Sequence, residues 1–200
     1  MGPGQSLPTK PHPVVEYWGK KLSISLYERG VTNTVDLRDD DLGLLRWDQQ
    51  MGVDFALEWY QRGDVLYFSE GPECEPFDRR RLWRMYQYLN CHGRLYIIHL
   101  YAHGRWQAVG DVTLARDMLP IVLGEECYRG KGLGFRTLSL LIHYAKNELH
   151  WPRLIAHQIY TYNSASLGLF NKAGFVVTAS GLDKQGIPYV RMERLLYPDQ

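Results

Sequence analysis

The chain carries a glycine-rich segment, Tyr128-Arg129-Gly130-Lys131-Gly132-Leu133-Gly134-Phe135. An apolar run precedes it and apolar residues at helical spacing follow it, so it is predicted to join a strand to a long helix. Glycines at such a turn let backbone N–H groups approach an anion, because no Cβ is in the way. The start of the helix adds the positive end of its dipole. With Arg129 and Lys131 as expected sources of formal charge, the segment predicts a phosphate-binding loop.

The spacing of the glycines narrows the choice of phosphate ligand. The GxxxxGK[ST] pattern of a P-loop is absent from the sequence. A GxGxxG dinucleotide fingerprint does not fit, because Gly134 falls one place early and no acidic residue follows about 20 positions later at a strand end. The segment does fit R-x-x-G-x-G. A tight turn without a ligand is the alternative, but three glycines and two cations exceed what a turn requires.

A second motif follows one predicted helix and one predicted strand later. Asn163-Ser164-Ala165-Ser166 precedes Leu169-Phe170-Asn171-Lys172-Ala173-Gly174-Phe175. At this spacing the two motifs resemble those of the GCN5-related N-acetyltransferase (GNAT) superfamily. The resemblance covers about residues 106–195 and is greatest to the branch of ribosomal-protein, polyamine and aminoglycoside acetyltransferases.

The coarse pattern predicts an α/β (α+β) fold, since antiparallel strands are followed by strand–helix–strand–helix. The resemblance implies the GNAT fold, a mixed, largely antiparallel central sheet with splayed strands flanked by helices. Residues 1–15 are expected to be a disordered leader and 16–200 a single domain. Helices are expected at 42–45 (capped by 39–41), 54–61, 78–89, 132–149 and 164–173, and strands at 22–27, 65–68, 94–101, 106–115, 117–123, 154–160, 175–179 and 189–195.

The resemblance also implies acetyl-CoA as cosubstrate and a primary amine as acceptor. Leu123, with Ile121 as a second candidate, is expected to pair its backbone with the pantetheine arm. The pyrophosphate is expected to bind the loop, and Asn163 to hydrogen-bond near the pantetheine or the thioester. An ordinary helix N-cap is the alternative role of Asn163. The expected loop residues are Arg129, Gly130, Lys131, Gly132, Leu133 and Gly134.

Direct attack of an amine on the thioester needs a base, a donor to the carbonyl oxygen and an acid for the thiolate. The N–H of Leu123 is the expected donor. Many relatives use a tyrosine four residues before the final glycine of the second motif as the general acid, and this sequence has Phe170 at that position. The remaining options are Ser166, water or an unaided thiolate. A satisfied helix hydroxyl is the alternative role of Ser166.

Asp111 is the candidate base, because it lies between apolar residues in a strand of the expected central sheet. The alternative is a solvent-facing or capping aspartate. Glu125 and Glu126 lie near the loop but fit solvated acids better, and a water chain is a further route for the proton. His99 and His157 are expected to be structural.

The first half of the chain is expected to supply the acceptor pocket. Its aromatic residues and interspersed acids could attract a cationic amine, although core aromatics and a solvated acidic face explain them more simply. The aromatic residues are Trp47, Trp59, Tyr60, Tyr67, Phe68 and Trp83, and the acids are Asp48, Asp54, Glu58, Asp64 and Glu70.

Composition excludes several classes. The net charge is +1 and the residues of opposite charge are interspersed, which argues against nucleic-acid or membrane partners. Three cysteines without a CxxC pair argue against a disulfide framework or a zinc site. The chain is expected to be a cytoplasmic monomer or homodimer that acetylates a small cationic amine such as an aminoglycoside or polyamine. A protein N-terminus as acceptor, a non-catalytic acyl-CoA-binding regulatory module and a nucleotide-binding domain are the alternatives.

Overall fold

The computed structural model describes residues 36–197, which lie in one compact unit, Val35–Gln200. The predicted leader and the predicted strand at 22–27 lie outside the described residues. No helix within 36–197 is long and apolar enough to cross a membrane.

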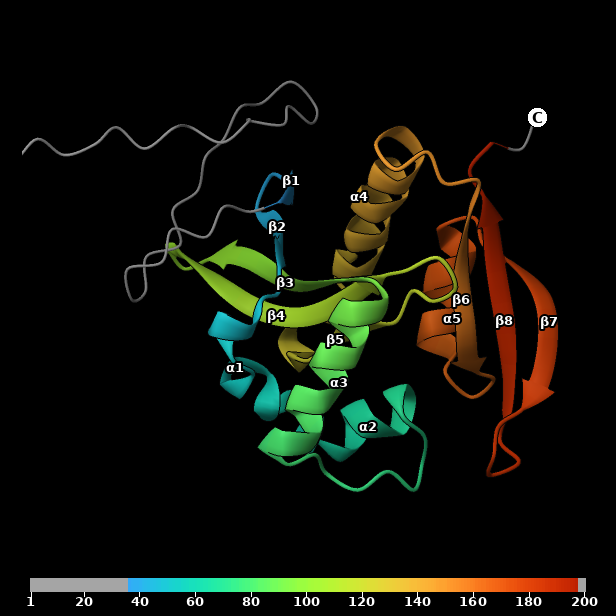
Figure 1. Ribbon diagram of the computed structural model, residues 1–200, viewed down its shortest axis with the longest axis horizontal. Coiled ribbons are helices and arrows are strands. Elements are labelled where there is room, and N and C mark those ends of the chain that lie inside the picture. Colours follow the sequence, from blue (N-terminus) through green and yellow to red (C-terminus); the bar gives the residue numbers. More distant parts are fainter. Residues whose placement is uncertain (1–35, 198–200) are drawn as a thin grey trace, which may run out of the picture. The chain divides into compact units, whose positions relative to one another are not determined.

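Five antiparallel strands form the first sheet, in the order β1-β2-β3-β4-β5 (Figure 1). The hairpin of β3 and β4 turns at His103 and Gly104, as predicted, and both residues have a positive φ. Apolar side chains cover the middle of the sheet, where Ile97, Ile98 and Val112 are fully buried. The strands are β1 (Leu37–Asp39), β2 (Leu42–Arg46), β3 (Arg94–Ala102), β4 (Arg105–Leu114) and β5 (Ile121–Leu123).

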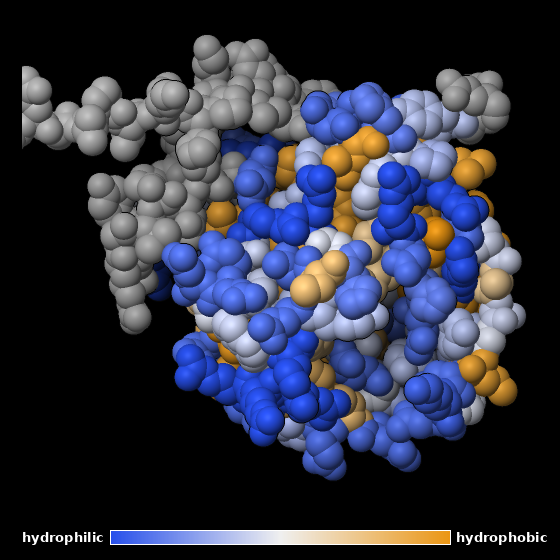
Figure 2. Space-filling view, in the orientation of Figure 1, coloured by the Kyte–Doolittle hydropathy of each residue, from blue (hydrophilic) through white to orange (hydrophobic). Residues whose placement is uncertain are grey.

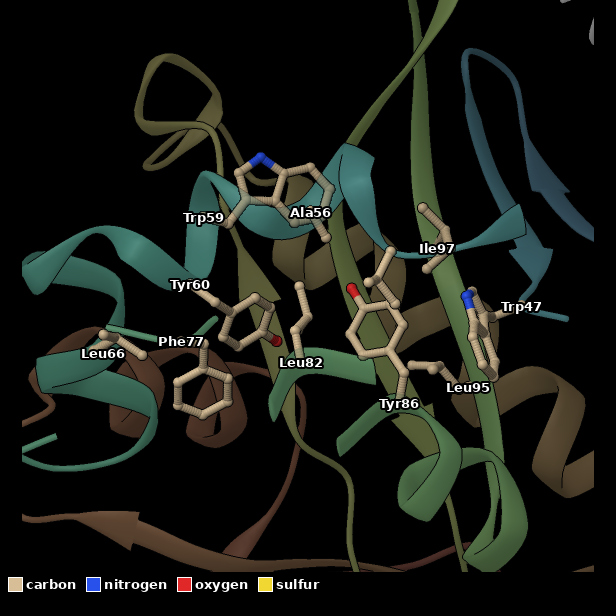
Figure 3. Packing of buried hydrophobic residues seen from close by; sticks show 11 residues of the cluster. Trp47, Ala56, Trp59, Tyr60, Leu66, Phe77, Leu82, Tyr86, Leu95 and Ile97 are labelled. Atoms are coloured by element: carbon tan, nitrogen blue, oxygen red, sulfur yellow. The ribbon is translucent and has the colours of Figure 1, made fainter. Parts of the chain in front are cut away.

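The helices between β2 and β3 pack an aromatic core on this sheet (Figure 3). Asp78 caps α3 as predicted, because its side chain accepts from the Arg81 amide. The core combines Trp47, Trp59, Tyr60, Phe77 and Tyr86 with smaller apolar residues. The elements are η1 (Gln49–Met51), α1 (Asp54–Leu57), η2 (Trp59–Gln61), α2 (Gly63–Ser69) and α3 (Arg79–His92).

The second half of the chain forms a separate three-stranded antiparallel sheet, in the order β6-β8-β7. β5 and β6 are therefore edge strands of different sheets, as expected of splayed strands. The mixed, largely antiparallel α/β class is confirmed. The elements are η3 (Glu126–Tyr128), α4 (Leu133–Asn147), β6 (Arg153–Tyr160), α5 (Ser164–Lys172), β7 (Val176–Leu182) and β8 (Pro188–Leu195).

Two predicted elements were wrong. The helix predicted at 42–45 is strand β2, which pairs with β1 on one side and β3 on the other. Asp40 has a φ of 53° and lies in the turn between β1 and β2, so the carboxylate run marks a hairpin and not a helix cap. The run Leu42 to Leu45 is buried throughout, which is the pattern of an interior strand.

The predicted extended segment at 65–68 is part of helix α2, and Gly63 begins this helix instead of ending the one before it. Val65 and Leu66 are buried, whereas Tyr67 and Phe68 are exposed. Two adjacent buried residues followed by two exposed ones fit a helix lying on a core, and not an alternating strand.

Candidate active site

Strand β5 ends in a β-bulge next to β4. The amides of Gly124 and Glu125 both point to the carbonyl oxygen of Val109, at 3.0 and 3.4 Å. Two amides opposite one carbonyl are the pattern of a bulge. Gly110 allows the close approach of the two strands, since a Cβ there would lie 2.1 Å from the Val122 oxygen.

The register of β4 and β5 determines which backbone groups of β5 point away from β4. The amide of Thr113 donates to the Pro120 oxygen and that of Gly124 to the Val109 oxygen, both at 3.0 Å. Antiparallel pairs alternate between hydrogen-bonded and non-hydrogen-bonded positions, so Ile121 and Leu123 turn their backbone N–H and C=O groups away from β4. These groups face the outer edge of the sheet. The Leu123 oxygen accepts from Arg129 Nε there, and the remaining groups fit the predicted pairing with an extended ligand.

The glycine-rich loop after η3 is open. Gly130 and Gly132 have φ values of 71° and 80°, in the left-handed region that glycine tolerates. A Cβ on either residue would have no heavy atom within 4 Å, apart from its chain neighbours. Within the described part of the chain, no backbone carbonyl accepts from the amides of residues 130–135. The exposed residues 130–132 and the first turn of α4 therefore carry several N–H groups without a backbone partner.

Gly134 connects the loop to its neighbours. A Cβ on Gly134 would lie 3.1 Å from Leu169 of α5 and 3.9 Å from Leu123 of β5. Leu133 is buried at the same helix start. The first turn of α4 thus lies close to both β5 and α5, so the two sequence motifs meet in space.

Arg129 binds protein groups. Its Nε donates to the Leu123 oxygen at 2.9 Å and one terminal nitrogen to the Gly124 oxygen at 3.3 Å. The other terminal nitrogen forms an ion pair with Asp64 of α2 at 2.6 Å. The pKa of Asp64 falls to about 2, mainly because Arg62 hydrogen-bonds its carboxylate, with Arg129 adding to the effect. Arg129 thus holds the end of β5 against α2, and exposed Lys131 is the loop's other cation.

Asn163 and Ser166 begin α5. The Asn163 side-chain oxygen accepts from the Ser166 amide at 3.0 Å, which is an N-cap, and its Nδ2 donates to the Phe68 oxygen at 3.1 Å. The cap predicted for Asn163 is present, and the same amide also joins α5 to α2. The Ser166 side chain is partly exposed.

Phe170 is a buried side chain of α5. It is 3% exposed, and its ring packs edge-on against Phe175 with centroids 5.0 Å apart. Phe170, at the position where many relatives have a tyrosine as general acid, therefore packs in the hydrophobic core.

Asp111 is buried beneath α3. Its carboxylate accepts from the Tyr60 hydroxyl at 2.9 Å and from the Tyr86 hydroxyl at 2.8 Å. Figure 3 shows both hydroxyl groups turned toward the space between the two rings. Burial raises the pKa of Asp111 to about 6, against the two hydrogen bonds, which lower it. The solvent-facing alternative does not describe this residue, whose pKa is suited to accepting a proton near neutral pH.

Glu125, Glu126 and His99 have defined partners. Glu125 accepts from the Trp59 indole at 2.9 Å, and Glu126 pairs with Arg62 at 3.1 Å. Nδ1 of buried His99 lies 3.2 Å from the Ile97 oxygen, and burial lowers its pKa. His157 is exposed where β6 shifts register. No group of three or more His, Cys, Asp or Glu residues suited to a metal ion occurs among the residues described.

The first-half aromatics divide into two sets. Trp47, Trp59 and Tyr60 belong to the core and Trp83 packs against it, as the simpler interpretation held. Tyr67 and Phe68 are about two-fifths exposed and lie beside Tyr162, which our sequence analysis did not single out. The signal was an aromatic residue directly before the Asn163 motif.

A family model described as "Acetyltransferase (GNAT) domain" matches residues 41–176, more than half of the chain. No curated protein matches the sequence significantly. A domain from Methanocaldococcus jannaschii is structurally similar with a TM-score of 0.63 and 20% identity, covering 77% of this chain and 97% of its own.

Two similar structures are of named acetyltransferases. Aminoglycoside acetyltransferase AAC(6')-Ib, solved with coenzyme A, has a TM-score of 0.63 and 16% identity, covering 78% of this chain and 96% of its own. A spermidine/spermine N-acetyltransferase from Vibrio cholerae has a TM-score of 0.60 and 17% identity, covering 79% and 95%. At these identities the likeness shows the fold.

Proposed function

Because this chain belongs to the GNAT acetyltransferase family, we propose that it transfers the acetyl group of acetyl-CoA to a primary amine. The observation that carries the proposal is the row of unpaired amides at residues 130–135, where two left-handed glycines leave the approach open. Such a helix start suits a diphosphate, and the outward N–H of Leu123 with the outward backbone groups of Ile121 suits the pantetheine arm and its thioester.

Each loop residue has a distinct part in this proposal. Gly130, Gly132, Leu133 and Gly134 offer backbone amides, and Lys131 adds a formal charge. Arg129 positions the loop by holding the Leu123 and Gly124 carbonyls. Asn163 positions the start of α5.

The chemistry needs an amine that has lost its proton. Asp111 is the proposed base, acting through the hydroxyls of Tyr60 and Tyr86 that bind its carboxylate. The Leu123 N–H donates to the thioester oxygen as that oxygen gains charge. Ser166 or water protonates the departing thiolate, since Phe170 has no proton to give.

The acceptor is proposed to be a small cationic molecule, such as an aminoglycoside or polyamine. The named structural neighbours are an aminoglycoside acetyltransferase and a spermidine/spermine acetyltransferase, which supports this choice of acceptor. A protein N-terminus is the competing acceptor within the same reaction.

A second candidate function is an acyl-CoA-binding module without turnover. The burial of Phe170 at the acid position favours it. Both candidates predict binding of CoA, but only the first predicts that free thiol accumulates when an amine is added.

The test measures thiol release from acetyl-CoA with a panel of small amines and short peptides. Release with a small polyamine or aminoglycoside supports the preferred acceptor, and release with peptides alone supports the N-terminal acceptor. Tight CoA binding with no thiol release on any amine would favour the module. Tighter binding of ATP than of CoA would end the acetyltransferase proposal.

A further inference from the structure

Three aromatic side chains, two of them exposed and one half-buried, form a cluster at the surface. Tyr67 is 41% exposed and Phe68 43%, both from α2, and Tyr162 follows β6. The ring centroids of Tyr67 and Tyr162 lie 4.6 Å apart, and those of Phe68 and Tyr162 lie 6.2 Å apart. Large apolar rings gathered at a surface are costly unless something covers them.

Specific hydrogen bonds hold the cluster in place. The Tyr162 hydroxyl donates to the Tyr67 backbone oxygen at 2.6 Å, and the Asn163 side chain donates to the Phe68 backbone oxygen at 3.1 Å. The Tyr162 ring also stacks on Tyr160 at 5.2 Å and 8°. The rings are therefore fixed and need little ordering when a ligand binds.

The cluster lies beside the proposed acetyl-transfer site. Helix α2 packs against β5 on one side and reaches the start of α5 through Asn163 on the other. It thus links β5 to the second sequence motif. Figure 2 shows the surface hollowed between the regions over α3 and β6.

The Asp183 carboxylate lies near the rings. The Tyr160 hydroxyl lies 3.1 Å from this carboxylate and 3.3 Å from the Glu70 backbone oxygen. Burial, with Tyr67 and Asp183 nearby, raises the pKa of Tyr162 to about 12. Among residues 36–197, no arginine or lysine lies over any of the three rings, although seven cation–π pairs occur elsewhere.

An ammonium ion suits such a surface, because ring faces and carboxylates both attract it. The amine that attacks a thioester must be neutral, so a cation on these rings is a different amino group from the one that reacts. We propose that Tyr67, Phe68 and Tyr162, with Asp183 nearby, hold a second, protonated amino group of the acceptor. This inference rests on the proposed function and narrows the acceptor to molecules with two or more amines.

The test compares linear diamines with the amino alcohols of the same lengths, which replace the second amine by a neutral hydroxyl. We expect the wild type to have a higher kcat/KM for diamines. Tyr67→Leu and Phe68→Leu should reduce that preference roughly three- to thirty-fold, in line with cation–π strengths. Tyr67→Phe keeps the ring and should keep the preference. Tyr101→Leu, at another exposed tyrosine, is the remote control.

Binding of CoA, measured for each variant, separates the outcomes. Acetyl transfer with no diamine preference, or with a preference that both leucine variants keep, would overturn the cation site and leave the proposed function standing. If no amine is acetylated, the proposed function fails, and calorimetry of the diamine with the protein judges the site. Diamine binding that Tyr67→Leu abolishes would then support the cation site, and no binding by the wild type would refute it.

Discussion

Asp111 is a residue whose surroundings conflict with its charge. Its carboxylate is fully enclosed, and two phenol hydroxyls offset only part of the cost of burying it. The pKa of about 6, against an ordinary value of 3.8, expresses that balance. Between these two values the folded protein binds more protons than the unfolded chain, so stability falls as pH rises through this window.

Asp111→Asn tests this at the level of one residue. The variant has no ionisable group at this position. Its free energy of unfolding should therefore rise relative to that of the wild type between pH 4 and 6, by about 3 kcal/mol for two pKa units. Urea unfolding across that range measures the difference. Parallel pH profiles for the two proteins would show that Asp111 does not carry the shift.

Phe170 tests whether the family's acid can be restored. A hydroxyl added at Phe170 would enter the packed contact with Phe175. We therefore expect Phe170→Tyr to lose about 1–3 kcal/mol of stability, the cost of a buried group without a partner, and to gain no activity. Thermal unfolding and thiol release measure the two effects. A more active and equally stable variant would show that the side chain reaches the thioester.

At the level of elements, Arg129 joins α2, β5 and the loop through three nitrogens. Its planar fork reaches two carbonyls and a carboxylate together, which a lysine cannot reproduce. The charge matters less than the shape, because the side chain is already paired with Asp64.

Arg129→Lys should therefore resemble Arg129→Ala. Both variants are expected to weaken binding of acetyl-CoA by about 1–3 kcal/mol, because the loop loses the hydrogen bonds that hold it. Calorimetric titration provides the measurement. If lysine restores wild-type affinity, the positive charge itself acts on the phosphate and the positioning role is wrong.

At the scale of the whole molecule, the fold was predictable because its strongest signals are local. The hairpin at His103 and Gly104, the Asp78 cap and the loop at Gly132 each depend on neighbours in sequence. The site depended on long-range contacts. The hydrogen bond between Asp111 and Tyr60 joins residues 51 positions apart, and that between Tyr162 and Tyr67 joins residues 95 positions apart. No rule of local spacing reveals such pairs. The error at 42–45 had the same origin, since pairing with β3 makes that segment a strand.

The central claim is that a CoA diphosphate binds the bare amides of residues 130–135. It is supported by the separation of β5 from β6 and by the open loop at the start of α4. Calorimetric titration of CoA into the wild type, Gly132→Val and Gly104→Val tests it most directly. Both glycines have positive φ and open surroundings, so the two variants share the same backbone strain. We expect Gly132→Val to lose at least roughly tenfold in affinity, since its side chain would obstruct the amides, while Gly104→Val binds like the wild type. Equal affinity for all three proteins would contradict the account.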